Sequence, residues 1–145
     1  MRLSSMGDYA VVTMAAAARH CGGARVHSAE LARETGLPSA TVQKLVSKLS
    51  AAGLLRATRG HGGGLQLARP AAAITLAEIV EAVEGPLALT ACADSGRHEC
   101  ALEGCCAVRP HMGLVNHAVR EALAAVPLAR LARPAPMPQL AGVPA

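Results

Sequence analysis

The fold is decided by residues 28–67, SAELARETGLPSATVQKLVSKLSAAGLLRATRGHGGGLQL. A short helix is expected to start with Ser28 as its N-cap and to end at Gly36. A second helix is expected to begin after Ser39 and to end at Gly53. Two helices joined by a tight, glycine-containing turn predict a helix-turn-helix. The apolar residues of the second helix follow the helical spacing i, i+3, i+4 and i+7, and they are Val42, Leu45, Val46 and Leu49.

The open face of the second helix carries short hydrogen-bonding side chains and two cations. Because the apolar stripe faces the core, these groups are left where they can contact base edges and phosphates in a major groove. A solvated amphipathic helix would have a similar polarity, so this pattern alone does not separate the two interpretations. The candidate DNA-contacting residues are Ser39, Thr41, Gln43, Lys44, Ser47 and Lys48.

The segment that follows has the pattern of a β-hairpin. Residues 54–59 and 65–67 alternate apolar and polar side chains, and RGHGGG between them predicts a flexible tip. A hairpin of this kind beside a helix-turn-helix is a wing, and it favours the DNA interpretation. Arg56, Arg59 and His61 are suited to contact a phosphate backbone or a minor groove. A nucleotide-phosphate loop would require a Lys-Ser/Thr ending, which RGHGGGL lacks.

Charge is unevenly distributed along the 145 residues, whose net charge is +4. Residues 1–69 contain nine Lys and Arg against three Asp and Glu, whereas residues 70–145 contain five against seven. A basic N-terminal half suits a surface that binds nucleic-acid phosphates. The chain has no Trp or Phe and one Tyr, so its core must consist of Ala, Val, Leu, Ile and Met. We therefore expect a mainly α-helical fold with one small β-hairpin, built from closely packed helices.

Two further helices are expected on either side of the segment 91–110. Thr75 and Glu78 form a capping-box pattern at the start of the first, which Gly85 stops. The second runs from Pro110 to about residue 126 and has a broad apolar face. We interpret part of this face as a dimer interface, and packing on its own domain is the alternative.

The chain is expected to divide into three parts. Residues 1–69 form the winged helix-turn-helix, and within them Asp8 is the expected N-cap of a first helix that runs to about residue 21. Residues 70–126 hold a connecting helix, the cysteine-containing loop and the dimerisation helix. Residues 127–145 contain five of the nine prolines and are expected to be a largely disordered tail.

Residues 91–110, ACADSGRHECALEGCCAVRP, contain four of the five cysteines. This loop has few large apolar residues, so an inorganic centre held by thiolates is the first candidate for what organises it. No apolar run approaches the length that spans a membrane, and the residues before position 9 are too weakly basic for a secretory signal. We therefore expect a cytoplasmic protein, where clustered cysteines more often bind metals or undergo redox chemistry than form disulfides. No catalytic triad, paired-carboxylate motif or cofactor fingerprint indicates an enzyme.

The order of these segments resembles the Rrf2 family of winged-helix regulators, of the IscR, NsrR and RirA type. The resemblance covers residues 1 to about 130 and rests on MRLSSMGDYAVVTM, the wing RATRGHGGGLQLARP, ITLAEIVEAVEGP and the cysteine loop. It implies a dimeric transcription factor, expected to be a repressor, that binds a pseudo-palindromic operator in double-stranded DNA. Many members use an iron–sulfur cluster to sense cluster status, iron, oxygen stress or nitric oxide. The loop looks most like that of members that regulate the SUF cluster-assembly operon.

The resemblance implies that Cys92, Cys100 and Cys106 hold the cluster. Five residues separate the last two cysteines in iron-binding members, as they separate Cys100 and Cys106 here. Seven residues lie between Cys92 and Cys100, where IscR-like members have five. Cys105 is an additional thiol, and we favour Cys106 over it as the ligand.

The fourth ligand is open. IscR-like members use a His three residues after the last cysteine, but this chain has Arg109 there, and a guanidinium cannot ligate a metal. NsrR-like members use an Asp near the N-terminus of the partner subunit, a position that Asp8 matches here. A plain helix cap is the alternative role for Asp8, and His98 and His111 are other candidate ligands. The sequence does not distinguish a [2Fe–2S] from a [4Fe–4S] cluster.

Three other interpretations compete with a cluster-controlled regulator. Structural zinc sites usually contain C-x₂₋₄-C pairs, and neither cysteine spacing is one. A metal-free thiol switch would use Cys105 or Cys106 as its reactive group. A winged helix can also serve as a protein-interaction module without binding DNA. Three thiolates with one weaker donor make a labile centre, which suits a sensor better than an electron carrier.

Overall fold

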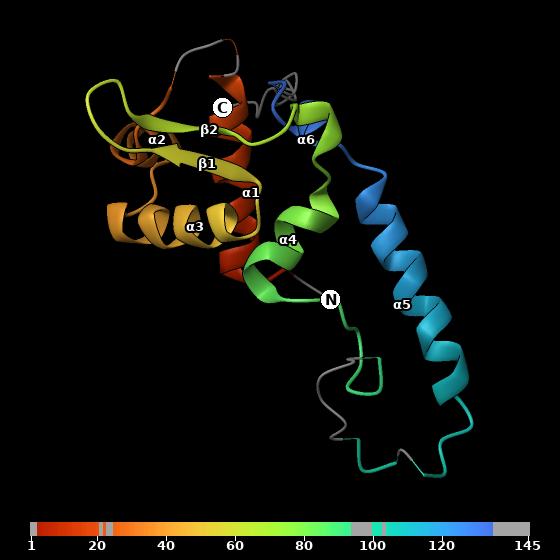
Figure 1. Cartoon of the computed structure of the whole chain (residues 1–145). Helices are drawn as coiled ribbons and strands as arrows, with labels where there is room; N and C mark the ends of the chain where they lie inside the picture. The colour runs from red at the N-terminus through yellow and green to blue at the C-terminus, as the bar shows by residue number, and fades with distance from the viewer. Residues whose placement is uncertain (1–2, 21, 23–24, 94–99, 103, 135–145) are drawn as a thin grey trace, which may run out of the picture.

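The computed structural model describes residues 3–20, 22, 25–93, 100–102 and 104–134. These residues form a mainly helical structure with one two-stranded antiparallel hairpin, which confirms the predicted fold class (Figure 1). The elements in chain order are α1 (Ser5–Arg19), α2 (Ser28–Thr35), α3 (Ser39–Ala51), β1 (Leu55–Thr58), β2 (Gly64–Leu67), the short 3-10 helix η1 (Ala71–Ala73), α4 (Leu76–Glu84), α5 (Arg109–Ala124) and α6 (Leu128–Leu131).

Helices α2 and α3 form the predicted helix-turn-helix. Gly36 ends α2 in a left-handed conformation with φ of 70°, which a side chain would disfavour, and α3 begins three residues later. Val42, Leu45 and Leu49 of α3 are buried, as the apolar spacing predicts. The prediction that Ser28 caps α2 is wrong. His27 occupies the N-cap position, and its side chain makes no capping hydrogen bond.

The start of α1 differs from the prediction because Ser4, four residues before Asp8, provides the cap. Ser4 is the N-cap, and its Oγ accepts a hydrogen bond from the Gly7 amide at 3.2 Å. The same hydroxyl donates to Glu84 Oε1 at 2.7 Å, which joins the start of α1 to the end of α4. Asp8 therefore lies in the first turn of α1 rather than at its cap, and its side chain is exposed. The helix ends at Arg19 rather than at residue 21.

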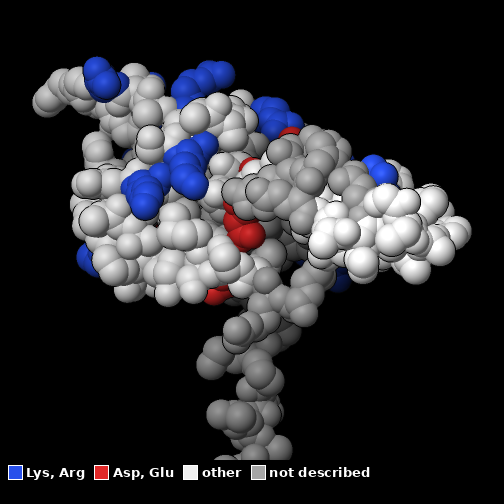
Figure 2. All heavy atoms as spheres, turned by 90° about the horizontal axis from the view of Figure 1, so that it is seen from below, with Lys and Arg blue, Asp and Glu red and all other residues white. Residues whose placement is uncertain are grey.

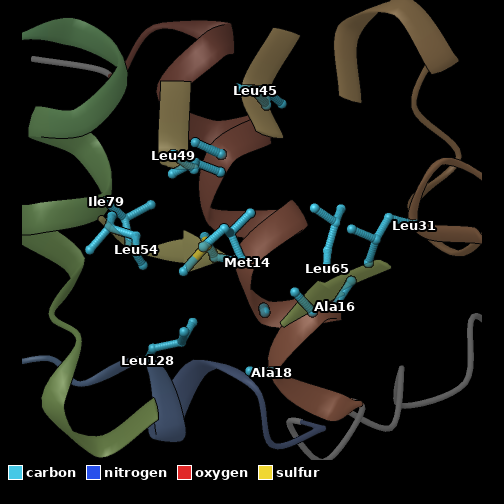
Figure 3. Close-up of a cluster of buried hydrophobic side chains, with 14 of the residues drawn as sticks. Met14, Ala16, Ala18, Leu31, Leu45, Leu49, Leu54, Leu65, Ile79 and Leu128 are labelled. Atoms are coloured by element: carbon cyan, nitrogen blue, oxygen red, sulfur yellow. The ribbon is translucent and has the colours of Figure 1, made fainter. Parts of the chain in front are cut away.

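The hydrophobic core surrounds α1, whose buried face consists of small residues and Met14. Helices α2, α3, α4 and α6 and strand β2 all pack against α1. Figure 3 shows Met14 near the centre of the cluster, with Leu54, Leu65 and Leu128 placed around it by three other segments. The absence of Phe and Trp thus leads to a core of aliphatic side chains closed around a helix with small side chains.

The wing is an antiparallel hairpin in which Leu55 pairs with Leu67 and Thr58 pairs with Gly64. Leu55 and Leu65 are buried, so one face of the hairpin packs on the helices. Val26, in the connection before α2, exchanges two backbone hydrogen bonds with Leu65, at 3.1 and 2.8 Å. The base of the wing is therefore fixed, whereas its tip extends beyond the body (Figure 1).

Helix α4 carries the capping box that the sequence predicts. The Thr75 Oγ1 accepts a hydrogen bond from the Glu78 amide, and the Glu78 carboxylate accepts one from the Thr75 amide. Helix α5 runs beside α4, and the cysteine-containing segment connects the far ends of the two helices (Figure 1). Within the described residues, no helix is both long and apolar enough to cross a membrane.

The expectation of a disordered tail from residue 127 is wrong for its first part. Leu128 is completely buried in the core, and its amide donates to the Ile74 carbonyl at 2.8 Å. The Leu76 amide also donates to the Val126 carbonyl at 2.9 Å, which anchors the chain before α6. Burial of one leucine and pairing with the start of α4 stabilise this segment despite its prolines. Residues 135–145 lie outside the described part of the chain.

Glu78→Gln should lower stability in a pH-dependent way. Burial raises the pKa of Glu78, but hydrogen bonds from Arg69 and Thr75 outweigh it, so the folded-state pKa lies below its ordinary value. The ionised carboxylate therefore stabilises the fold at neutral pH, and this contribution is lost as the pH falls below about 4.5. Because Gln preserves the capping box, we expect a loss of less than about 1 kcal/mol at pH 7. Denaturant melts should show this difference shrink toward pH 3, and a pH-independent difference would contradict the assignment.

Candidate DNA interface and cysteine loop

Helix α3 presents its predicted polar face to solvent. Ser39, Gln43, Lys44 and Ser47 are exposed, and Thr41 is half-buried. The opposite side of the helix is fixed by the buried stripe on α1, α2 and α4. A rigid helix with short polar side chains along one exposed face has the form required for entry into a major groove.

Lys48 differs from its neighbour Lys44 in where its ammonium group lies. The Lys48 Nζ donates a hydrogen bond to the Val83 carbonyl at 2.8 Å. Val83 is in the last turn of α4, where carbonyl groups lack helical partners and a cation is favourable. Lys48 therefore connects the recognition helix to α4, while Lys44 is available to an external phosphate.

The tip of the wing is built by backbone geometry that excludes larger side chains. A Cβ at Gly63 would collide with the carbonyl oxygen of Thr58, so this position requires glycine. The Arg25 guanidinium donates to the Gly62 carbonyl at 2.7 Å and holds the tip against the connection before α2. A cavity of about 300 Å³ lies beneath the wing. It is lined by His27, Ser28, Val46, Ala57, Thr58, Gly60, Gly63, Gly64 and Leu65.

The predicted cations of the wing, Arg56 and Arg59, and His61 at its tip, are all exposed. Figure 2 views the molecule from the side on which α3 lies, and Lys and Arg side chains gather over its left half. In Figure 1 this half contains the helix-turn-helix and the wing. The lobe that contains α5 shows few charged side chains in the same view. The positive charge that the sequence assigned to residues 1–69 is therefore concentrated around the helix-turn-helix and the wing.

Helix α5 anchors the segment that leads into the cysteine loop. The Asn116 side chain donates to the Leu87 carbonyl at 2.8 Å and accepts from the Leu89 amide at 3.1 Å. Because one side-chain amide bonds both a backbone carbonyl and a backbone amide of this segment, it holds the chain in place just before Cys92. The same segment lines a cavity of about 250 Å³ together with Leu3, Glu84, Ala88, Val119 and Leu123.

Helices α4 and α5 are joined by an ion pair of two hydrogen bonds. Arg120 donates to both Glu81 oxygens, at 2.9 and 3.1 Å, and these bonds raise the pKa of Arg120 above its ordinary value. Glu81 Oε1 also accepts from the Leu87 amide at 3.5 Å. Glu81 of α4 therefore binds both α5, through Arg120, and the segment that leads into the cysteine loop, through the Leu87 amide.

The four cysteines of the loop are free thiols with different exposure. Cys92, Cys100 and Cys106 are half-buried, whereas Cys105 is exposed. The Cys92 Sγ lies 3.1 Å from the Thr90 hydroxyl, with which it shares a hydrogen bond. In the described part of the chain, the ligand-type atoms that gather within 4.8 Å belong to another group, and Cys92, Cys100 and Cys106 are not drawn together in this way. A single tetrahedral zinc ion would need sulfur atoms about 3.8 Å apart, whereas a cluster with several irons spans a wider space.

The candidates for the fourth ligand belong to three different segments of the chain. Asp8 and His111 are both exposed, and His111 lies in the first turn of α5. His98 lies outside the described residues. Arg109 is the first residue of α5, so a His at this position would have been carried by the helix rather than by the loop.

Residues that connect the elements were missed by the sequence analysis. Asn116, Glu81, Arg120 and Arg25 make the hydrogen bonds described above, but none belongs to a motif. Their only sequence signal is a polar side chain beside an apolar helix face, as at Asn116 between Val115 and Val119. Such a signal is common on solvated helices, so the contacts become visible only in the fold.

Residues 3–134 match the Rrf2 family, which is described as iron-dependent transcriptional regulators. The chain belongs to this family. The resemblance drawn from the sequence is therefore confirmed, and so is its assignment as a winged helix-turn-helix transcriptional regulator. This Rrf2 regulator thus has a DNA-binding function, which agrees with the positive charge around α3 and the wing.

Relatives and solved structures agree with this membership. The chain is 33% identical over 131 residues to the HTH-type transcriptional regulator ORF2 of Azotobacter vinelandii, a match that spans 90% of the chain and 79% of that protein. It is 43% identical over 86 residues to IscR of Cereibacter sphaeroides, across 58% of the chain and 56% of that protein. Its fold is similar to that of CymR, the global cysteine regulator of B. subtilis, with a TM-score of 0.70 and 26% identity over 91% of the chain and 96% of the CymR chain.

Lys44→Ala and Lys48→Ala form a matched pair that tests the two lysines of α3. We expect Lys44→Ala to weaken binding to a labelled random-sequence duplex and to reduce the slope of log affinity against log salt by about one. Lys48→Ala should change the slope less, because its ammonium is bound to the Val83 carbonyl, and should lower thermal stability instead. Fluorescence anisotropy at several salt concentrations measures the slopes. Equal reductions of the salt slope in both variants would show that both lysines contact DNA phosphates, which would contradict the different roles assigned to them.

Proposed function

We propose that this Rrf2 regulator is a dimeric repressor whose operator binding is controlled by an iron–sulfur cluster held in the cysteine loop. Cys92, Cys100 and Cys106 supply three thiolate ligands, and the partner subunit's Asp8 supplies the fourth. The controlled genes are those of SUF-type cluster assembly or of an iron, redox or nitric oxide response. The similarity to IscR of Cereibacter sphaeroides supports this assignment.

The observation that carries the proposal is the position of the thiols between two helices that are tied to each other and to the recognition helix. Cys92 follows the segment that Asn116 of α5 clamps, and Cys106 lies three residues before α5 begins. Glu81 joins α4 to α5 through Arg120, and Val83 accepts the hydrogen bond from Lys48 of α3. A change at the loop is therefore connected by direct contacts to the DNA-reading helix.

The donor set of the loop fits a cluster that is gained and lost. Three half-buried thiols with an exposed carboxylate combine strong ligands with one weak, oxygen-based ligand. A cluster bound in this way supplies redox chemistry and reacts or dissociates more readily than one with four thiolates. With Asp8 uninvolved in helix capping, its carboxylate is available for ligation.

Control of DNA binding requires that the cluster binds two conformations with different affinities. In a symmetric dimer, the two α3 helices enter major grooves about one helical turn apart, so their spacing determines affinity for a pseudo-palindromic operator. Cys92, Cys100 and Cys106 would hold the cluster between α4 and α5, and the contacts of Asn116, Arg120 and Lys48 would connect that site to α3. Equal affinity of apo and cluster-loaded protein for operators selected from a random pool would overturn this proposal.

Cys92→Ala, Cys100→Ala and Cys106→Ala should each abolish the visible absorbance of the cluster after anaerobic reconstitution. Cys105→Ala is the matched control, since it removes an adjacent thiol, and most of the absorbance should remain. Asp8→Ala should leave a coloured but more readily lost cluster. Mössbauer spectra and native mass spectrometry of the wild type identify the cluster type. A colourless wild-type protein after reconstitution would contradict cluster binding.

The dimer part of the proposal rests on apolar side chains of α5 and the segment before it. Leu114 is 70% exposed and Val115 is 46% exposed, and Leu102 and Val108 are also largely exposed. Val119 and Leu123 instead line the cavity beside the segment 87–89, so only part of the helix packs on its own domain. Exposed aliphatic residues grouped in this way favour an interface with a second copy of the chain.

Leu114→Glu and Val115→Glu should convert the dimer to a monomer, because each places a charge in the proposed apolar interface. Sedimentation equilibrium gives the mass of each variant. Ala72→Glu, an exposed alanine in η1, is the control and should stay dimeric. A wild-type protein that sediments as a monomer would disprove the interface.

A thiol switch is the second candidate function, and the exposure of Cys105 favours it. This thiol is adjacent to half-buried Cys106, and CymR, a fold relative, is a cysteine regulator. A cluster-free regulator of this kind would lose its redox response on Cys105→Ala or Cys106→Ala alone. In a cluster-dependent regulator, Cys92→Ala and Cys100→Ala remove the response as well.

A further inference from the structure

Three ligand-type side chains gather where the end of α1 meets α2. His20 occupies the C-cap of α1, and Glu30 and Glu34 lie one turn apart on the same face of α2. One nitrogen or oxygen atom from each lies within 4.8 Å of the other two. In Figure 1 this end of α1 lies at the opposite side of the body from the cysteine loop.

The electrostatics of the cluster favour a cation. Two carboxylates at i and i+4 repel each other on an isolated helix, and the carbonyl groups at the end of α1 attract positive charge. The His20 Nε2 lies 2.6 Å from Glu34 Oε1, and this hydrogen bond orients both side chains. The side chains of His20 and Glu34 are 25% and 27% exposed, and that of Glu30 is 39% exposed, so the group lies at the surface between the two helices.

Two arginines also face these carboxylates, but at longer distances. Arg19 lies 3.8 Å from Glu34, and Arg33 lies 3.9 Å from Glu30. Arg19 is 46% exposed and Arg33 is 79% exposed, so both guanidinium groups can move into solvent at little cost. A bound cation would have to compete with these two arginines for the carboxylates.

We propose that His20, Glu30 and Glu34 form a second metal site, which binds a divalent first-row transition cation such as Mn²⁺. One imidazole and two carboxylates suit this class, and waters would complete the coordination. The ion joins α1 to α2, and α2 packs directly on α3, the recognition helix. Occupancy of the site therefore stiffens the helix-turn-helix independently of the cysteine loop.

Mn²⁺ is the probe of choice, because carboxylates and imidazole bind it whereas thiolates select softer metals. Titration of the full chain, followed by loss of the electron paramagnetic resonance signal of free Mn²⁺, should show one site per chain. His20→Gln, Glu30→Gln and Glu34→Gln should each weaken binding by at least about tenfold. Glu121→Gln, which removes an exposed carboxylate from α5, should bind as the wild type does.

Two further measurements separate this site from the cysteine loop and from a misfolded variant. A variant with Cys92, Cys100 and Cys106 all changed to Ala should keep full Mn²⁺ affinity, and loss of binding there would overturn the proposal. Mn²⁺ should raise the melting temperature of the wild type but not that of His20→Gln, whose circular dichroism should match the wild type. Absence of Mn²⁺ binding at millimolar concentration, or equal binding by His20→Gln, would show that the three residues form ion pairs only.

Discussion

Close packing around the small-residue face of α1 is the constraint on which the structure depends. Buried alanines and Gly7 let α2, α3, α4, α6 and β2 contact one helix from several sides, so all share one core. A Cβ at Gly7 would meet the Glu84 carboxylate that accepts the hydrogen bonds of Ser4, so a larger residue there would displace this side chain. The helix-turn-helix, the wing and α4 therefore form one mechanical unit.

Helix α4 connects this unit to the outer part of the molecule. It receives Lys48 of the recognition helix at its last carbonyl groups and Arg120 of α5 at Glu81. Its first turn is fixed by the capping box and by the backbone pairing with the segment before α6. A helix held at its start and contacted at its end by both the recognition helix and α5 is well suited to transmit a small displacement. This arrangement gives the proposed cluster switch a physical route from the cysteine loop through α4 to α3.

Different parts of the molecule carry the positive charge, the thiols and the exposed aliphatic residues. Lys and Arg side chains gather around α3 and the wing, whereas the cysteine loop and α5 present thiols and exposed aliphatic residues. The first surface suits phosphates, and the second suits an inorganic centre and a second subunit. The proposed metal site of His20, Glu30 and Glu34 would add a third function at the C-terminal end of α1. Signals at the two proposed metal sites would then reach the helix-turn-helix through different helices, α4 and α2.

The sequence by itself determined the elements whose signals are local. Helical spacing gave the buried stripe of α3, Gly36 gave the turn, Thr75 and Glu78 gave the capping box, and the alternation around the glycine-rich tip gave the wing. The order of these motifs also identified the family. The tertiary structure alone decided what depends on residues far apart in the chain. Glu84 joins the Ser4 cap of α1 to the end of α4, Lys48 binds the Val83 carbonyl of α4, and Leu128 is buried in the core although it belongs to a proline-rich segment. Such contacts leave no periodic trace in the sequence, because their free energy comes from partners that only folding brings together.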